Sequence, residues 1–411
     1  MFLLRQRRPV LCRRPLRILS FLLAILPILS VRANAQLPPR LSQGAVVSLV
    51  TFSPGKPVHA LFGHGAFRVV DPAFGLDILF NYGTFDFDDE FVPKFMYGEL
   101  DYYLSVVGTK GSLEQAIEME RSVIEQVFDL DAEQRQTLYG TLVKNAHPDN
   151  RVYRYDFLFD NCSTRVIDML RATLDGSPGN ELVMPTGPYD GRSFRVLLGE
   201  HVAAKTWLDF GFDLLLGSTV DREATFEEAW FLPIHLMNAL DTATLSGRPL
   251  VSKTNVLLGQ AGEGLPPRAF DQPAALAWLL LALVIVLFRR DTGGPWSRRF
   301  DGALFGLAGL AGLFIALMWF GTLHHVTTAN WDLLWAWPTH LLAAIFLLKQ
   351  TRPNWMRIYL GLAAISALVV ALGIGLSLQF APAILPLGLV FVVRCARNLR
   401  PQRAQTTSDS E

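Results

Sequence analysis

The stretch that decides the fold of this chain is YDFLFDNCSTRV, residues 155–166. Residues 151–159 are typical of a strand or an extended loop. Residues 163–174 carry apolar side chains at positions 166, 167, 170 and 174, which is helical spacing. Cys162 is therefore predicted at a helix start, with Asp160, Asn161, Ser163 and Thr164 as candidates to cap it. A thiol there feels the positive end of the helix dipole, which favours the thiolate.

Cysteine usage separates Cys162 from the other two cysteines. Cys12 lies in a basic and apolar leader, and Cys395 lies near the end of the chain, where we give it no role beyond packing. An exported domain that contains Cys162 therefore has no internal disulfide partner for it. Two interpretations stay open for this residue alone: a buried structural cysteine and a nucleophile.

The first residues are typical of an export signal. Six arginines precede or border the apolar run 18–31, and Ala33-Asn34-Ala35 follows it as a small-residue cleavage pattern. We predict that residues 1–35 are a signal peptide. A single anchoring helix is the alternative, but the apolar run is shorter than the ~20 residues that a membrane span needs.

The composition changes at about residue 272. The chain has 411 residues and a net charge of zero, yet its charges concentrate in the first part. Residues 36–272 predict a soluble α+β domain that is long enough to bury a core. Residues 273–395 predict an all-α membrane domain of about five transmembrane helices, before a cytoplasmic tail at 396–411. The five segments are 273–288, 302–320, 331–348, 358–376 and 378–393.

The positive charges predict the orientation of these segments. Basic residues gather in 289–299, 349–357 and 394–403, whereas the loop 321–330 contains neither Lys nor Arg. With five spans the three basic segments share one side, which the positive-inside rule makes cytoplasmic. We therefore expect a multi-pass protein of the bacterial inner membrane, with residues 36–272 in the periplasm.

A nucleophilic thiol needs a base, and His64 is the best candidate among the histidines. It lies between Gly63 and Gly65, and alternating residues after it predict a strand. Residues 76–82 predict a second strand beyond a turn, and antiparallel pairing could bring Asn81 or Tyr82 beside His64 to fix its tautomer. The alternative for His64 is a core histidine.

The order of these residues is also informative, because His64 precedes Cys162 by 98 positions. Ordinary papain-like chains have the cysteine first. A Gly-His pair on a strand followed by Asn-Cys at a helix start resembles the circularly permuted papain-like (NlpC-like) group, which includes lecithin–retinol acyltransferase. In that group the thiolate takes an acyl chain from a phospholipid.

The whole chain resembles the Lnb-type lipoprotein N-acyltransferase family. The resemblance is carried in the first part by FGH (62–64), NYGTFDF (81–87), GELDY (98–102), DNCSTR (160–165) and FLP (231–233). In the second part it is carried by HHVTTANW (324–331) and Pro338, although the family's His-Pro is here His325-Val326.

This resemblance implies a cysteine acyltransferase that moves an acyl chain from a phospholipid, through a thioester on Cys162, to the N-terminal amine of an exported lipoprotein. His64 would be the base. From the predicted strand pairing with His64, Asn81 is our candidate for the third catalytic residue. The expected partners are a phospholipid donor, a lipoprotein acceptor and the membrane. Substrate-binding candidates are Arg165, Tyr82, Asn161, His324, His325 and Asn330.

Several of these residues also have a purely structural explanation. Arg165 and Asp168 are spaced for a helix-face pair, with phosphate recognition by Arg165 as the alternative. The aromatic residues from Phe91 to Tyr103 form either an acyl groove at the interface or ordinary core. Because we find no metal-ligand spacing, phosphate-binding glycine loop or basic nucleic-acid patch, we expect no cofactor, metal or nucleic acid.

Two other functions stay open from the sequence. A thiol peptidase or amidase acting on peptidoglycan peptides would use the same Cys162 and His64, but it gives no reason for five spans. A non-catalytic envelope-binding protein would leave the thiol unreactive.

Overall fold

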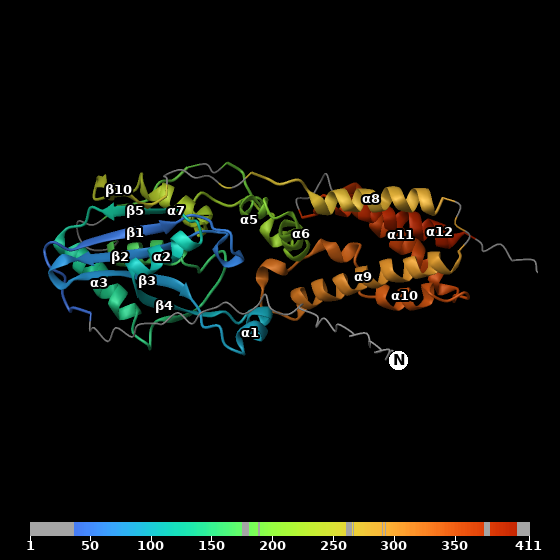
Figure 1. The fold of residues 1–411 in the computed structure, drawn as a ribbon, viewed down its shortest axis with the longest axis horizontal. Coiled ribbons are helices and arrows are strands. Elements are labelled where there is room, and N and C mark those ends of the chain that lie inside the picture. The colour runs from blue at the N-terminus through green and yellow to red at the C-terminus, as the bar shows by residue number, and fades with distance from the viewer. Residues whose placement is uncertain are drawn as a thin grey trace, which may run out of the picture. The chain divides into compact units, whose positions relative to one another are not determined.

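The computed structural model describes residues 37–174, 181–187, 190–259, 265, 267–289, 291, 293–373 and 379–400 (Figure 1). The predicted signal peptide, Cys12 and residues 401–411 of the predicted tail lie outside these residues. A mixed α/β part precedes a helical part, in agreement with the expected fold class. The circular permutation and the number of spans stay predictions.

The first part is built on a seven-stranded antiparallel sheet in the order β10-β5-β1-β2-β3-β4-β6 (Figure 1). Its strands are β1 (Val46–Phe52), β2 (His64–Asp71), β3 (Leu76–Thr84), β4 (Asp101–Gly108), β5 (Val123–Phe128), β6 (Val152–Arg154) and β10 (Val251–Leu258). A small three-stranded sheet joins β7 (Leu182–Val183), β8 (Thr244–Leu245) and β9 (Arg248–Pro249).

Side chains that alternate along the strands pack against other elements on both faces of the large sheet. On one face, Val50, Ala66 and Leu79 pack in one cluster with Ala116 of α2 (Thr109–Glu118). On the other face, Phe80 meets Tyr139 of α3 (Ala132–Asn145) edge to face, with ring centroids 6.3 Å apart. Because side chains alternate, neighbouring residues of one strand face opposite layers.

The remaining helices of this part are α1 (Phe91–Tyr97), α4 (Thr164–Leu174), α5 (Phe194–Val202), α6 (Thr206–Leu215) and α7 (Pro233–Leu240). The start of α4 lies within one residue of the predicted start. A second core cluster supports the chain just before it, where Leu158 packs with Phe194, Leu197, Phe231 and Leu232.

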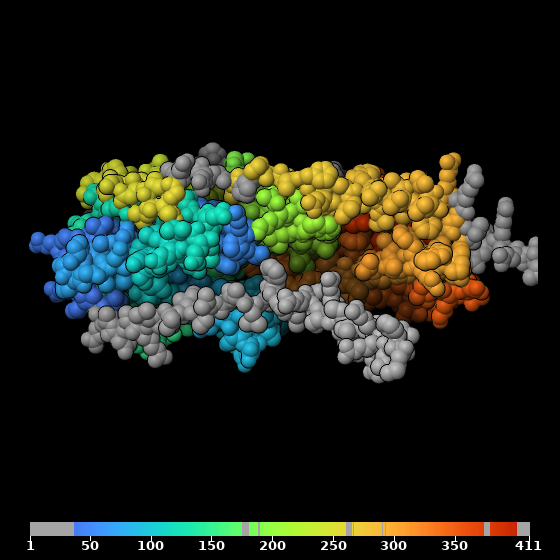
Figure 2. All heavy atoms as spheres, viewed as in Figure 1, coloured from blue at the N-terminus to red at the C-terminus, as the bar shows by residue number. Residues whose placement is uncertain are grey.

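The second part contains α8 (Gln272–Leu287), α9 (Pro295–Phe320), α10 (His340–Leu347), α11 (Trp355–Gly373) and α12 (Ile384–Leu399). Among the described residues, α9 and α11 are long and apolar enough to cross a membrane, and α8 is a shorter apolar helix. Large apolar side chains of these helices face outward, including Leu307, Leu317 and Ile358. Figure 2 shows α8 (yellow-orange) lying on the surface of this part.

The third predicted span, 331–348, is not one continuous helix. It consists of a 3₁₀ turn (Trp331–Leu334) followed by α10, whose eight residues extend for only about 12 Å. Pro338 between them lacks an amide donor, and Asp332 is buried with its carboxylate bonded to the Trp335 indole N–H (2.6 Å). The fifth segment also differs, because α12 begins at Ile384 rather than at 378. Residues 374–378 lie outside the described chain.

A buried ion-pair cluster ties the helices together near the predicted cytoplasmic end. Arg394 of α12 is fully buried and donates to Asp301 of α9 (2.6 Å), to Asp291 (3.2 Å) and to Ser297 (2.6 Å). Because a buried arginine without partners would be very costly, this cluster fixes how α12 meets α9. Cys395 beside it is fully buried, as its expected packing role requires.

Close backbone contact between α9 and the segment before α10 gives a stability prediction. A Cβ on Gly312 would lie 1.7 Å from the carbonyl oxygen of Ala336, so Gly312→Ala must push the two segments apart. We expect a loss of about 1–3 kcal/mol, seen as a lower Tm of the full-length protein in detergent. Gly306→Ala is the matched control, since its Cβ would meet nothing nearer than the Cβ of Ala344 at 3.9 Å. Equal Tm values for the two variants would contradict this packing.

Candidate functional site

Cys162 lies two residues before α4, which begins at Thr164. The side chain of Asn161 holds this loop in place through hydrogen bonds. The Asn161 oxygen accepts the backbone N–H groups of Ser163 (2.7 Å) and Thr164 (3.0 Å). Its nitrogen donates to the carbonyls of Phe157 (2.8 Å) and Phe231 (2.9 Å). The first turn of α4 is therefore capped, and Cys162 is held at the positive end of the helix.

His64 and Asn81 reach the same place from neighbouring strands. His64 is the first residue of β2, and the antiparallel register with β3 pairs Phe67 with Phe80. Continuing that register puts Asn81 opposite Ala66, on the same face as His64. The side-chain oxygen of Asn81 forms a hydrogen bond with His64 Nε2, so Nδ1 is the ring nitrogen left for Cys162.

The Cys162 thiol and the His64 imidazole share a hydrogen bond and shift each other's pKa. Burial raises the pKa of the Cys162 thiol, but the charge and hydrogen bond of His64, the Gly65 N–H and the charge of Arg121 together lower it below the ordinary thiol value. Burial lowers the pKa of His64, whereas the charge and hydrogen bond of Cys162 and the hydrogen bond of Asn81 raise it above its usual value. Both shifts favour a thiolate–imidazolium pair, the reactive form of a cysteine nucleophile.

Arg121 is a member of this site that the sequence did not indicate. Its Nε donates to the carbonyl of Ser53 (2.6 Å) and its Nη2 to that of Phe52 (3.3 Å), with the guanidinium 5.3 Å from the Phe52 ring centre. Burial lowers the pKa of Arg121 to about 10, against the opposing charge of Cys162. It therefore stays charged and favours the thiolate. It follows α2 by only three residues, and no motif marks it.

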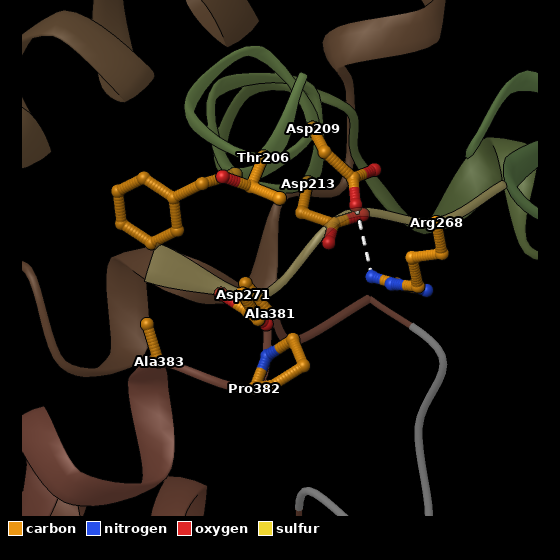
Figure 3. A pocket seen from close by; sticks show the side chains of 9 residues that line it. Thr206, Asp209, Asp213, Arg268, Asp271, Ala381, Pro382 and Ala383 are labelled. Atoms are coloured by element: carbon orange, nitrogen blue, oxygen red, sulfur yellow. Dashed lines mark hydrogen bonds and ion pairs between the residues drawn. The ribbon is translucent and has the colours of Figure 1, made fainter. Parts of the chain in front are cut away.

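A pocket opens beside these residues. It has an open volume of ≈ 370 Å³, and its wall includes Phe52, His64, Asn81, Met119 and Arg121. A second, smaller pocket of ≈ 190 Å³ lies among Asp209 and Asp213 of α6, Arg268 and Ala381 (Figure 3). Arg268 bridges to Asp209 at 2.9 Å in that pocket, and none of the predicted site residues lines it.

Two predicted substrate-binding residues have their polar groups engaged inside the protein. Tyr82 is fully buried on the sheet face opposite His64, where its hydroxyl accepts from Asn145 (2.9 Å). Asn161 is 3% exposed, and its amide is used by the four bonds described above. Both side chains therefore contribute to the structure around the site, and their predicted role in substrate binding stays a prediction.

Arg165 lies on α4 beyond the nucleophile. It forms a two-pronged ion pair with Asp160, including Nη2 to Oδ2 at 2.6 Å, rather than the predicted pair with Asp168. Its guanidinium also stacks 4.1 Å from the ring centre of Tyr153. Asp160 is favoured because it lies in the same turn as the cap, where its carboxylate meets the guanidinium edge.

The three predicted residues of the membrane part dock on the first part. His324 Nε2 contacts the carbonyl oxygen of Phe95 (2.9 Å), and His325 Nδ1 lies 3.2 Å from the Asp156 carboxylate. Asn330 is buried and donates to the carbonyl of Leu214 in α6 (2.9 Å). Asp156 also accepts the N–H groups of residues 158 and 159, so His325 contacts the turn that leads to Cys162.

The pKa shifts predict how fast the thiol reacts with an alkylating agent. The Cys162 pKa lies below the usual value, so iodoacetamide should modify Cys162 at pH values where an ordinary thiol is protonated. In His64→Ala the main lowering charge is gone while burial remains, so the midpoint of the rate-against-pH curve should rise. Arg121→Gln should raise it less. At pH values below the midpoint, the rate falls about tenfold for each unit by which the Cys162 pKa rises.

Peptide mass spectrometry measures this rate at Cys162, with buried Cys395 reporting any unfolding. Identical pH profiles for the original chain, His64→Ala and Arg121→Gln would contradict a Cys162 pKa that His64 and Arg121 lower.

Comparison with known proteins identifies the relatives of both parts. The model of the Lnb N-terminal periplasmic domain matches residues 40–193, and the model of the Lnb transmembrane domain matches residues 267–405. Searches of curated proteins and of solved structures found no match. The two domains occur here in one chain and in the order that the sequence motifs predicted. The chain therefore belongs to the Lnb-type family, as a membrane protein with a periplasmic part.

Proposed function

We propose that this protein is a lipoprotein N-acyltransferase in which Cys162 carries the acyl group as a thioester. The single observation that carries the proposal is the hydrogen-bonded series Asn81–His64–Cys162 at a helix start. The family supports a membrane protein that processes lipoproteins. The acceptor, the amine of a diacylglyceryl-modified cysteine, comes from the family resemblance.

In the first half-reaction the Cys162 thiolate attacks the carbonyl carbon of a phospholipid ester. The new C–S bond forms as the carbonyl becomes an oxyanion, and the C–O bond to glycerol then breaks. The His64 imidazolium gives its proton to the departing alkoxide, so lysophospholipid leaves as an alcohol. Asn81 holds the ring so that the same nitrogen faces the sulfur and the leaving oxygen.

In the second half-reaction the lipoprotein amine attacks the thioester carbonyl. Neutral His64 accepts the proton of the amine, the C–N bond forms, and the C–S bond breaks to return the thiolate. The products are an amide and the starting ion pair, so no other reactant is needed.

The helix start supplies a donor for the oxyanion of both steps. Asn161 already occupies the N–H groups of Ser163 and Thr164, whereas the N–H of Cys162 has no partner among the described residues. We propose that the Cys162 N–H donates a hydrogen bond to the oxyanion, since preorganised donors of this kind contribute strongly to acyl transfer. The charge of Arg121 nearby favours any anionic state at this point.

The trapped intermediate tests the proposal. Purified full-length protein incubated with phospholipid should gain the mass of one acyl chain, whereas Cys162→Ala should gain none. Cys395→Ala is the matched control, because that thiol is buried in α12, and it should acylate like the original chain. A gain of mass in Cys162→Ala, or its absence in the original chain, would overturn the thioester.

A second measurement follows transfer to the acceptor. His64→Ala should lower the rate of lipoprotein N-acylation by about 10²–10⁴-fold, the usual contribution of a general acid–base residue. Mass spectrometry of the lipoprotein N-terminus measures the product. If Cys162→Ala cells kept N-acylated lipoproteins while the purified protein cleaved muropeptides, the peptidase alternative would replace this proposal.

A further inference from the structure

Helix α1 and the turn before it expose an unusual concentration of large apolar side chains. The exposed fractions are 65% for Phe87, 55% for Val92, 44% for Phe95, 40% for Met96 and 48% for Tyr97. Figure 2 shows this segment (light blue) protruding at the lower edge of the molecule. A contiguous exposed patch of this kind marks a site of interaction with an apolar partner.

The patch is continuous with the end of a predicted membrane span. Leu323, three residues after α9, donates its N–H to the carbonyl of Tyr97 (2.8 Å), and His324 contacts the carbonyl of Phe95. Gly98 permits this approach with a left-handed φ of 91°, since a Cβ there would lie 3.1 Å from the Leu323 Cβ. Phe320, the last residue of α9, is 72% exposed and Leu323 is 56% exposed. The α1 patch therefore extends the lipid-facing surface of α9.

The inner side of α1 leads to the nucleophile through stacked rings. Phe91 stacks on Phe85 (centroids 4.8 Å apart), Phe85 lies 5.0 Å from Tyr102, and Tyr102 stacks on Tyr155 at 4.4 Å. Tyr155 borders the nucleophile, since a Cβ on Gly83 would lie 3.6 Å from the Cys162 Cβ and 4.0 Å from the Tyr155 Cε2. Because these rings cover one another's faces, the row presents mainly apolar ring edges to hydrocarbon and few hydrogen-bonding groups.

We propose that the exposed face of α1, with Phe320 and Leu323, lies in the outer boundary of the bilayer between headgroups and acyl chains. The ring row from Phe91 to Tyr155 then guides a phospholipid acyl chain from that boundary to Cys162; this second half rests on the proposed function. The partner is a lipid surface, because the patch is joined to a membrane-facing helix by direct contacts.

The charges around α1 indicate which lipids it accepts. Asp88, Asp89 and Glu90 precede the helix, and its one basic residue, Lys94, is paired with Glu90 (2.6 Å). An acidic segment gains nothing from anionic headgroups, so the contact is apolar. We therefore expect zwitterionic lipids to serve at least as well as anionic ones.

Photo-crosslinking tests the surface without relying on acyl transfer. Benzoylphenylalanine is placed at position 87 or 95 of the full-length protein in nanodiscs of phosphatidylcholine, with or without phosphatidylglycerol. Mass spectrometry after illumination should find lipid adducts at both positions in both compositions. Position 74 is the matched control, because Phe74 is 57% exposed in the turn between β2 and β3. Absence of adducts at 87 and 95, or equal yields at 74, would overturn the proposal.

Kinetics test the route to Cys162. Val92→Asp with Phe95→Asp should raise the apparent KM for bilayer phospholipid about tenfold. Acylation of Cys162 by a short-chain, water-soluble nitrophenyl ester should be unchanged, and Phe74→Asp should change neither. Equal losses with both donors would contradict a lipid route. If adducts form at 87 and 95 but phospholipid never acylates Cys162, the lipid surface stands and the proposed function fails.

Discussion

The amide of Asn161 is the contact on which the candidate site depends. One buried side chain caps α4, closes the turn from Phe157 and bonds to the carbonyl of Phe231 in a distant segment. The Asn161 side chain is buried, and a buried polar group without a partner costs about 1–3 kcal/mol. The position of the neighbouring sulfur is thus set by groups from three parts of the chain.

Much of this arrangement follows from local patterns. The helical spacing after residue 163 and the capping residues before it placed Cys162 correctly at the start of α4. Alternation in two short strands brought His64 and Asn81 to one face. The same alternation puts Tyr82 on the other face, since a shift of one residue reverses the side of the sheet. Only one of Asn81 and Tyr82 can lie beside His64, because successive side chains of a strand point to opposite faces of the sheet.

Other parts depend on long-range contacts that a single sequence does not contain. Arg121 enters the site because the backbone of Ser53 meets that of Ser122 (2.9 Å) where β1 and β5 pair. His325 reaches Asp156 across 169 positions of the chain. The third predicted span was wrong as a continuous helix because hydropathy averages over Pro338 and over buried polar groups such as Asp332, whose Oδ1 accepts the Trp335 indole N–H.

The reactivity of Cys162 belongs to the folded domain and not to the cysteine itself. His64, Asn81, Arg121 and the helix start come from four separate segments, and the groups that lower the thiol pKa meet only when the sheet and α4 have packed together. In a newly exported, unfolded chain the same sulfur is an ordinary thiol, mostly protonated at neutral pH. Folding is therefore the step that lowers the pKa of Cys162, and until the chain has folded the protonated thiol reacts only slowly with electrophiles and oxidants.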